Sequence, residues 1–167
     1  MKKILALCLL TAISLPCFAG TINVSGRAGV YTIPGGGGTS AMYGLSADYG
    51  ITPNLSVRGA LETTSYPSGS ETVTYTPVTL DLIYHQDIGG MLEPYAGAGV
   101  SYNSTNVGGV TTQTTGAQAE TGIKFTFGSF SAGVEYRYLI PDLNNTASGT
   151  PTYNAYATSS FSESFSF

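Results

Sequence analysis

The segment AQAETGIKFTFGSFSAGVEYRY (residues 117–138) contains two runs in which small or apolar residues alternate with polar ones, joined by Gly128-Ser129. Alternation with a period of two is typical of β-strands with one apolar face. A two-residue connection containing glycine is typical of a hairpin turn. The apolar face carries Ala117, Ala119, Ile123, Phe125, Phe127, Val134, Tyr136 and Tyr138, and the polar face carries Gln118, Glu120, Lys124, Glu135 and Arg137. The segment therefore predicts an antiparallel pair of amphipathic strands.

The same alternation recurs along the chain between clusters of Gly, Pro, Asn and Ser. No apolar stretch of about 18 residues follows residue 19, so no membrane-spanning helix is expected. The predicted strands cover residues 21–32, 41–49, 55–65, 73–84, 92–102, 115–127, 130–139 and 152–167. We expect a single all-β domain.

The predicted connections alternate between short and longer segments. The short ones are 50–54, 85–90 and 128–129, and the longer ones are 33–40, 66–72, 103–114 and 140–151. This alternation is expected of an eight-stranded antiparallel up-and-down transmembrane β-barrel with periplasmic turns and extracellular loops. An even number of strands then places the N- and C-termini on the periplasmic side.

The charged residues separate by strand face. Only Glu71, Asp87 and Asp142 lie in predicted connections, and only Glu163 lies on an apolar face. The polar faces carry Arg27, Asp48, Arg58, Glu62, Asp81, Glu93, Glu120, Lys124, Glu135 and Arg137. A soluble barrel of the lipocalin kind would expose only these charges, with almost no lysine, which is few for a soluble surface. We therefore expect the apolar face to meet lipid and the charges to lie in the lumen.

The outward aromatic residues form two bands, as the two interfaces of a bilayer favour. The band near the short turns contains Tyr49, Tyr84, Phe127, Phe130, Phe165 and Phe167, and the band nearer the loops contains Tyr43, Tyr102, Tyr138 and Tyr153.

Residues 1–19 have the features of a cleaved secretory signal peptide, with Lys2 and Lys3 before an apolar run. Cleavage between Ala19 and Gly20 places small residues at both recognition positions, so residues 20–167 are expected to form the barrel domain. Lipid modification at Cys17 is the less favoured alternative, because Leu15 and Pro16 precede it.

Both cysteines of the sequence lie in this leader, so disulfides and cysteine-based chemistry are not expected in the mature chain. Removing the two leader lysines leaves four basic residues against ten acidic ones, a net charge of −6. A chain with this balance is a poor partner for nucleic acid.

Three internal motifs and the terminal residue carry a family resemblance. EPYAGAGVSY (93–102), GITPNLSVRGAL (50–61), FSAGVEYRYLIP (130–141) and Phe167 resemble the small outer-membrane β-barrel family, which includes the OmpA transmembrane domain, OmpX, OmpW and the opacity proteins. The resemblance covers the whole mature chain and indicates a class of barrel, not an activity.

The resemblance implies a monomer in the bacterial outer membrane, surrounded by lipid and lipopolysaccharide. It also implies recognition of the C-terminal aromatics by the barrel-assembly machinery, with Phe161, Phe165 and Phe167 as the signal. Glu163 departs from that signal, because the position usually holds an apolar residue or glycine.

Hairpin counting assigns some partners in the lumen. If Phe127 faces Phe130, Glu120 lies opposite Arg137, and Lys124 faces Gly133 with Glu135 on the diagonal. In the hairpin centred near Thr52, Asp48 falls close to Arg58. Because an eight-stranded barrel is just filled by side chains, we expect the ten inward charges to form an ion-pair network.

The alternative is a narrow conduit that prefers cations, because carboxylates outnumber cations in the lumen. Inward glycines would leave space for it unless longer side chains fill that space. They are Gly29, Gly44, Gly97, Gly99, Gly122 and Gly133.

Catalysis is not expected, because the single histidine, His85, lies at a predicted turn beside Gln86 and Asp87. No cluster has the spacing of metal ligands, and no cofactor is expected. We expect a non-enzymatic barrel with a structural or adhesion-type role through its extracellular loops, and the sequence names no surface ligand.

Overall fold

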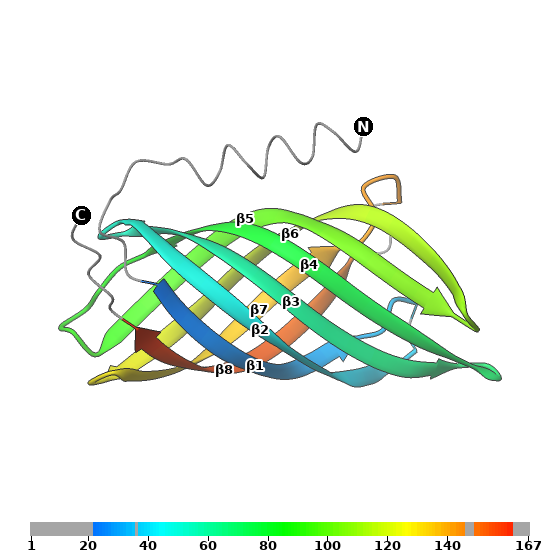
Figure 1. The fold of residues 1–167 in the computed structure, drawn as a ribbon, viewed down its shortest axis with the longest axis horizontal. Helices are drawn as coiled ribbons and strands as arrows, with labels where there is room; N and C mark the ends of the chain where they lie inside the picture. Colours follow the sequence, from blue (N-terminus) through cyan, green and yellow to red (C-terminus); the bar gives the residue numbers. More distant parts are fainter. Residues whose placement is uncertain (1–21, 36, 146–148, 162–167) are drawn as a thin grey trace.

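The computed structural model describes residues 22–35, 37–145 and 149–161. These residues form a closed antiparallel barrel in which each strand pairs with its neighbours in sequence and β1 pairs with β8 (Figure 1). Its eight strands are β1 (Ile22–Thr32), β2 (Thr39–Thr52), β3 (Leu55–Ser68), β4 (Glu71–His85), β5 (Leu92–Val107), β6 (Val110–Phe127), β7 (Phe130–Ile140) and β8 (Thr150–Phe161). The predicted fold class is confirmed.

No helix in the described ranges is long and apolar enough to cross a membrane.

The turns β2–β3, β4–β5 and β6–β7 lie at one end of the barrel, which we call the short-turn end (Figure 1, left). β1 begins and β8 ends at this end. The other four connections lie at the opposite end, which we call the loop end (Figure 1, right).

Two of the predicted long loops are wrong. β3 and β4 continue to Gly69-Ser70, and β5 and β6 continue to Gly108-Gly109, so both connections are two-residue turns. Gly108 and Gly109 have φ angles of 56° and 90°, which tight hairpin turns require and glycine adopts without strain. The signal that was missed is the Gly-Gly turn between two runs rich in Thr and Val. Such residues favour strands, and where water reaches both faces a strand needs no alternation of apolar and polar residues.

The two extended hairpins, β3–β4 and β5–β6, project beyond the rest of the barrel at the loop end (Figure 1). The strands that form them are therefore longer than predicted at that end. The β1–β2 and β7–β8 connections remain longer segments, as expected.

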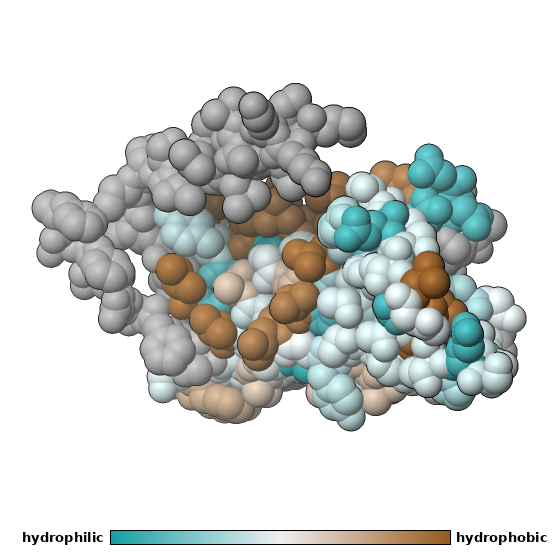
Figure 2. All heavy atoms as spheres, turned by 45° about the vertical axis from the view of Figure 1, so that its right-hand side comes forward, coloured by the Kyte–Doolittle hydropathy of each residue, from teal (hydrophilic) through white to brown (hydrophobic). Residues whose placement is uncertain are grey.

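The barrel is apolar outside and polar inside along the strands. Leu80 in the middle of β4 is 57% exposed, whereas the neighbouring Asp81 is 2% exposed. The same holds for Val100 and Ser101 on β5. On the face in Figure 2, apolar residues gather over the barrel wall, and hydrophilic ones gather toward the end where the hairpins project.

Most of the described residues in the two aromatic bands are exposed on the outer face, as predicted, whereas Tyr49 is half-buried. Tyr84, Phe127 and Phe130 are exposed near the short turns. Tyr43, Tyr102, Tyr138 and Tyr153 are exposed nearer the loop end. Phe165 and Phe167 lie outside the described residues.

Candidate functional site

Three arginines and three glutamates lie in the middle of the barrel, each at most 6% exposed. We call them the charge cluster: Arg27, Arg58, Arg137, Glu62, Glu120 and Glu135. They come from β1, β3, β6 and β7, whose inward positions meet only because the barrel is closed. Equal numbers of opposite charges offset the cost of burying each one.

Among the three glutamates of the charge cluster, Glu135 has the most ionic contacts. Its carboxylate contacts the guanidinium groups of Arg27, Arg58 and Arg137, with Arg58 at 2.8 Å and Arg137 at 3.4 Å. The hydroxyl of Tyr95 donates a hydrogen bond to the same carboxylate at 2.8 Å. Glu135 therefore joins all three arginines.

The predicted pair of Glu120 and Arg137 lies in register across β6 and β7, but the contact is long. The nearest approach is 3.9 Å, whereas Glu120 lies 2.9 Å from Arg58 on β3. Arg137 lies 2.6 Å from Glu62, also on β3. Strand register places residues opposite each other on the wall, but these long side chains find closer partners across the lumen.

The predicted neighbours Asp48 and Arg58 are opposite each other on β2 and β3, and their side chains are 2.5 Å apart. Lys124 lies opposite Gly133 on β7, as predicted, but its ammonium lies 2.5 Å from Glu93 on β5. The register of β5 and β6 makes Lys124 and Glu93 direct partners. Sequence counting missed this pair because it treated the Gly108-Gly109 turn as a long loop.

Asp81 lies inside the barrel and is held by an amide group. Gln118 donates a hydrogen bond to its carboxylate at 2.6 Å. Within the described ranges, Asp81 has no basic group within 4.0 Å. It therefore differs from the ion-paired carboxylates with which it was grouped.

Side chains occupy the space beside the inward glycines. A β-carbon at Gly122 would lie 2.4 Å from the hydroxyl oxygen of Tyr95, and one at Gly133 would lie 2.4 Å from the ring of Tyr156. At Gly44, a β-carbon would lie 2.6 Å from the side chain of Glu62. These glycines therefore accommodate long neighbouring side chains.

The loop end of the interior contains an apolar plug that the sequence analysis missed. We define the plug as Tyr31, Met42, Tyr75 and Leu139, all at most 3% exposed. The Tyr31 and Tyr75 rings stack at 5.2 Å between centroids. The available signal was apolar or aromatic residues at inward positions of β1, β2, β4 and β7.

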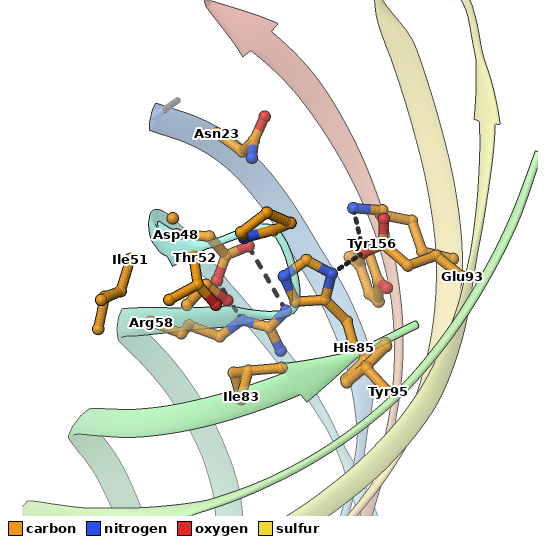
Figure 3. A pocket seen from close by; sticks show the side chains of 14 residues that line it. Asn23, Asp48, Ile51, Thr52, Arg58, Ile83, His85, Glu93, Tyr95 and Tyr156 are labelled. Atoms are coloured by element: carbon orange, nitrogen blue, oxygen red, sulfur yellow. Dashed lines mark hydrogen bonds and ion pairs between the residues drawn. The ribbon is translucent and has the colours of Figure 1, made fainter. Parts of the chain in front are cut away.

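At the short-turn end the interior opens into a cavity of about 500 Å³, which we call the vestibule (Figure 3). Its walls include Asp48, Arg58, His85, Glu93 and Lys124. The ring of His85 is directed toward Glu93, with Nδ1 3.5 Å from the carboxylate. The sequence predicts His85 at a turn; it is the last residue of β4 and lines this cavity.

No group of three or more His, Cys, Asp or Glu in the part of the chain that the structure describes is placed to hold a metal ion. Ala19 and Gly20 at the predicted cleavage site, and Glu163, Phe165 and Phe167 near the C-terminus, lie outside the described residues. The backbone of Phe161 pairs with Ile22. The assembly signal and the cleavage site therefore stay predictions.

Comparison with known proteins gives matches over nearly the whole chain at low identity. The N-terminal β-barrel domain of Pseudomonas aeruginosa OprF is 23% identical, with a TM-score of 0.64 over 85% of this chain and 99% of that one. Neisserial surface protein A (NspA) is 19% identical, with a TM-score of 0.69 over 86% and 98%. Ail of Yersinia pestis, solved with the heparin analogue sucrose octasulfate, is 16% identical, with a TM-score of 0.62 over 85% and 99%.

No curated protein sequence matches the chain. The sequence does match the family described as "Outer membrane protein beta-barrel domain" over residues 5–167. The solved structures share the fold of this closed barrel. In this chain the outer face carries exposed apolar residues. The chain therefore belongs to the outer membrane protein β-barrel family and is a protein of the bacterial outer membrane.

Proposed function

We propose that this protein is a non-conducting, non-enzymatic barrel that acts at the cell surface through its projecting β3–β4 and β5–β6 hairpins. The observation that carries the proposal is the filling of the interior. The plug occupies the loop end and the charge cluster occupies the middle. Because side chains fill both regions, we expect no passage for solute and assign the contact with a partner to the projecting hairpins.

The projecting hairpins are ordered β-ribbons with polar side chains paired across them. The hydroxyl oxygens of Thr63 and Thr76 lie 3.2 Å apart, and those of Ser65 and Thr74 lie 3.1 Å apart. In the other hairpin, Asn106 donates a hydrogen bond to the Thr111 hydroxyl at 2.9 Å. A rigid polar surface loses little conformational entropy on binding, which favours recognition.

The charge of these hairpins argues against a polyanionic partner. Ail was solved with a heparin analogue. Here Glu71 is the single charged residue in segments 63–76 and 103–114, and neither segment contains Lys or Arg. We therefore propose an uncharged, hydrogen-bonding partner for this surface.

The contacts of His85 support a non-enzymatic role. Among the described residues, no hydroxyl group is hydrogen-bonded to its imidazole, and the nearby carboxylate of Glu93 also binds Lys124. A nucleophile activated by histidine needs such a hydrogen bond.

The orientation of the barrel is tested by labelling single cysteines on intact cells. Residues 1–19 contain both natural cysteines and are proposed to be removed, so Val110→Cys and Ser129→Cys each introduce one thiol. Val110 begins β6 at the β5–β6 turn and is 70% exposed, whereas Ser129 lies in the β6–β7 turn. We expect a membrane-impermeant maleimide to label Val110→Cys on intact cells and Ser129→Cys only after the outer membrane is permeabilised. The opposite pattern would place the hairpins in the periplasm and overturn the surface role.

Conductance separates the surface role from the cation-preferring conduit. We expect the full chain, purified from outer membranes and inserted in a planar bilayer, to give no reproducible current steps. Its folded state is checked by the shift in gel mobility on heating. Reproducible steps that rescale in Arg58→Gln would make the lumen a conduit, because Arg58 contacts three carboxylates there.

A further inference from the structure

The vestibule has features of a small-molecule site that the surface role does not use. Its volume of about 500 Å³ lies within the range of cavities that bind small ligands. Side chains of Tyr95, Tyr156 and Ile83 line it and pack together as a buried cluster. The charge cluster lies further along the barrel, so the vestibule ends within the barrel.

One wall of the vestibule carries an ammonium group with a single ion partner among the described residues. Lys124 Nζ and His85 Nδ1 lie 2.5 Å and 3.5 Å from the same oxygen of Glu93. A lysine ammonium has three N–H donors, and Glu93 is the single ion partner of Lys124 among the described residues. On another wall, Asp48 is bound by Arg58 through two contacts of 2.5 Å and 3.4 Å. The wall with Lys124 therefore has unused donors for an anion.

A buried hydroxyl lies over β7, the strand that pairs with the strand of Lys124. Lys124, Gly133 and Tyr156 are opposite one another on β6, β7 and β8. Because Gly133 has no side chain, the Tyr156 ring lies over it, with the hydroxyl oxygen 2.5 Å from where a β-carbon would stand. Tyr156 is 6% exposed, and its hydroxyl, although close to that of Tyr95, makes no hydrogen bond of ordinary length and angle among the described residues. A buried hydroxyl without a partner is costly, so a bound acceptor would stabilise it.

Apolar groups line the same cavity. Ile83, Ile51 and Pro53 contribute aliphatic surface, and Tyr95 and Tyr156 contribute aromatic rings. A ligand that suits these walls combines an anionic head with an apolar body. The head would accept hydrogen bonds from Lys124 and Tyr156, and the body would lie against the apolar residues.

We propose that the vestibule binds a small organic carboxylate with an aromatic or aliphatic body, reached from the short-turn end. Lys124 and Tyr156 bind the carboxylate, and His85 stands beside it. The vestibule lies at the opposite end of the barrel from the hairpins. The absence of carboxylate binding would therefore leave the proposed surface role unaffected.

The test uses the full chain purified in detergent from outer membranes, with benzoate as the probe. His85 is the single histidine of the sequence, so its imidazole C–H signal in a proton NMR spectrum reports on the vestibule alone. We expect benzoate to shift this signal saturably. Benzyl alcohol and benzylammonium, which share the ring but lack the carboxylate, are expected to leave it nearly unchanged.

Two variants and a matched control assign the contacts. Lys124→Met keeps an apolar stem without the ammonium and is expected to weaken benzoate binding about tenfold. Tyr156→Phe removes only the hydroxyl and is expected to weaken binding about threefold to tenfold. Tyr153→Phe removes a hydroxyl from the outer face of the same strand and is expected to leave the affinity unchanged.

Three results would overturn the proposal, each in protein whose folding is confirmed by gel mobility. One is the absence of a saturable shift with benzoate. The second is an equal or larger response to benzyl alcohol or benzylammonium. The third is equal benzoate affinity in Tyr156→Phe and Tyr153→Phe, a comparison that does not depend on the folding of Lys124→Met.

Discussion

Replacing Glu135 by glutamine is expected to lower the free energy of unfolding by about 3–5 kcal/mol, the typical effect of breaking a buried ion pair. Glutamine keeps the shape of the side chain but removes its charge. The three arginines of the charge cluster are then left with Glu62 and Glu120 as their acidic partners in that cluster. Their excess positive charge is buried, where water cannot stabilise it.

The matched control is Glu93→Gln, the same substitution at the vestibule. The Glu93 and Lys124 side chains are 21% and 23% exposed, so water compensates for the lost pair and we expect a change below about 1 kcal/mol. The chain has no tryptophan, so unfolding in urea is followed by circular dichroism and by gel mobility. An equal loss of unfolding free energy in Glu135→Gln and Glu93→Gln would show that burial does not determine how much these ion pairs stabilise the barrel.

Leu80→Arg is expected to destabilise the barrel in a bilayer by about 2–4 kcal/mol, as for a basic residue placed near the bilayer midplane. Leu80 faces outward on β4, between the aromatic bands represented by Tyr84 and Tyr102. Its side chain is expected to contact lipid tails, which cannot hydrate a guanidinium.

Val110→Arg provides the comparison, because Val110 is also apolar and exposed but lies at the β5–β6 turn. Water is expected to surround it, so the change should stay within about 0.5 kcal/mol. Both variants are unfolded by guanidinium in the presence of lipid vesicles. A similar loss of stability in Leu80→Arg and Val110→Arg would contradict the placement of the apolar outer face in the membrane.

Much of the wall of the barrel follows from local sequence features. The two-residue turn at Gly128-Ser129 sets the register of β6 and β7, and counting back from it places Glu120 opposite Arg137 as observed. Alternation assigned the inward and outward faces because successive side chains of a strand point to opposite sides. The alternation stops at the Thr-rich tips of the β3–β4 and β5–β6 hairpins, and the predicted strands therefore ended too early there.

The candidate site was less predictable than the wall that positions it. The position of Lys124 opposite Gly133 was predicted correctly. Its ion partner Glu93 was missed, because that pair depends on the β5–β6 register and the register depends on the missed Gly108-Gly109 turn. The plug and the vestibule were missed for another reason. Tyr31, Met42, Ile83 and Tyr156 are inward residues that a search for charges does not find.

The sequence by itself determined the strand type, the two faces and the neighbours across the recognised tight turns, since all of these depend on residues close together in the chain. The tertiary structure decided which charges meet, because Arg58, Glu120 and Glu135 come from β3, β6 and β7 and touch only after closure joins β1 to β8. It also decided that the interior has a plug at one end and a vestibule at the other. The physical reason is that strand tilt and the curvature of the closed wall set the distances across the lumen, and residue spacing along one strand does not encode them.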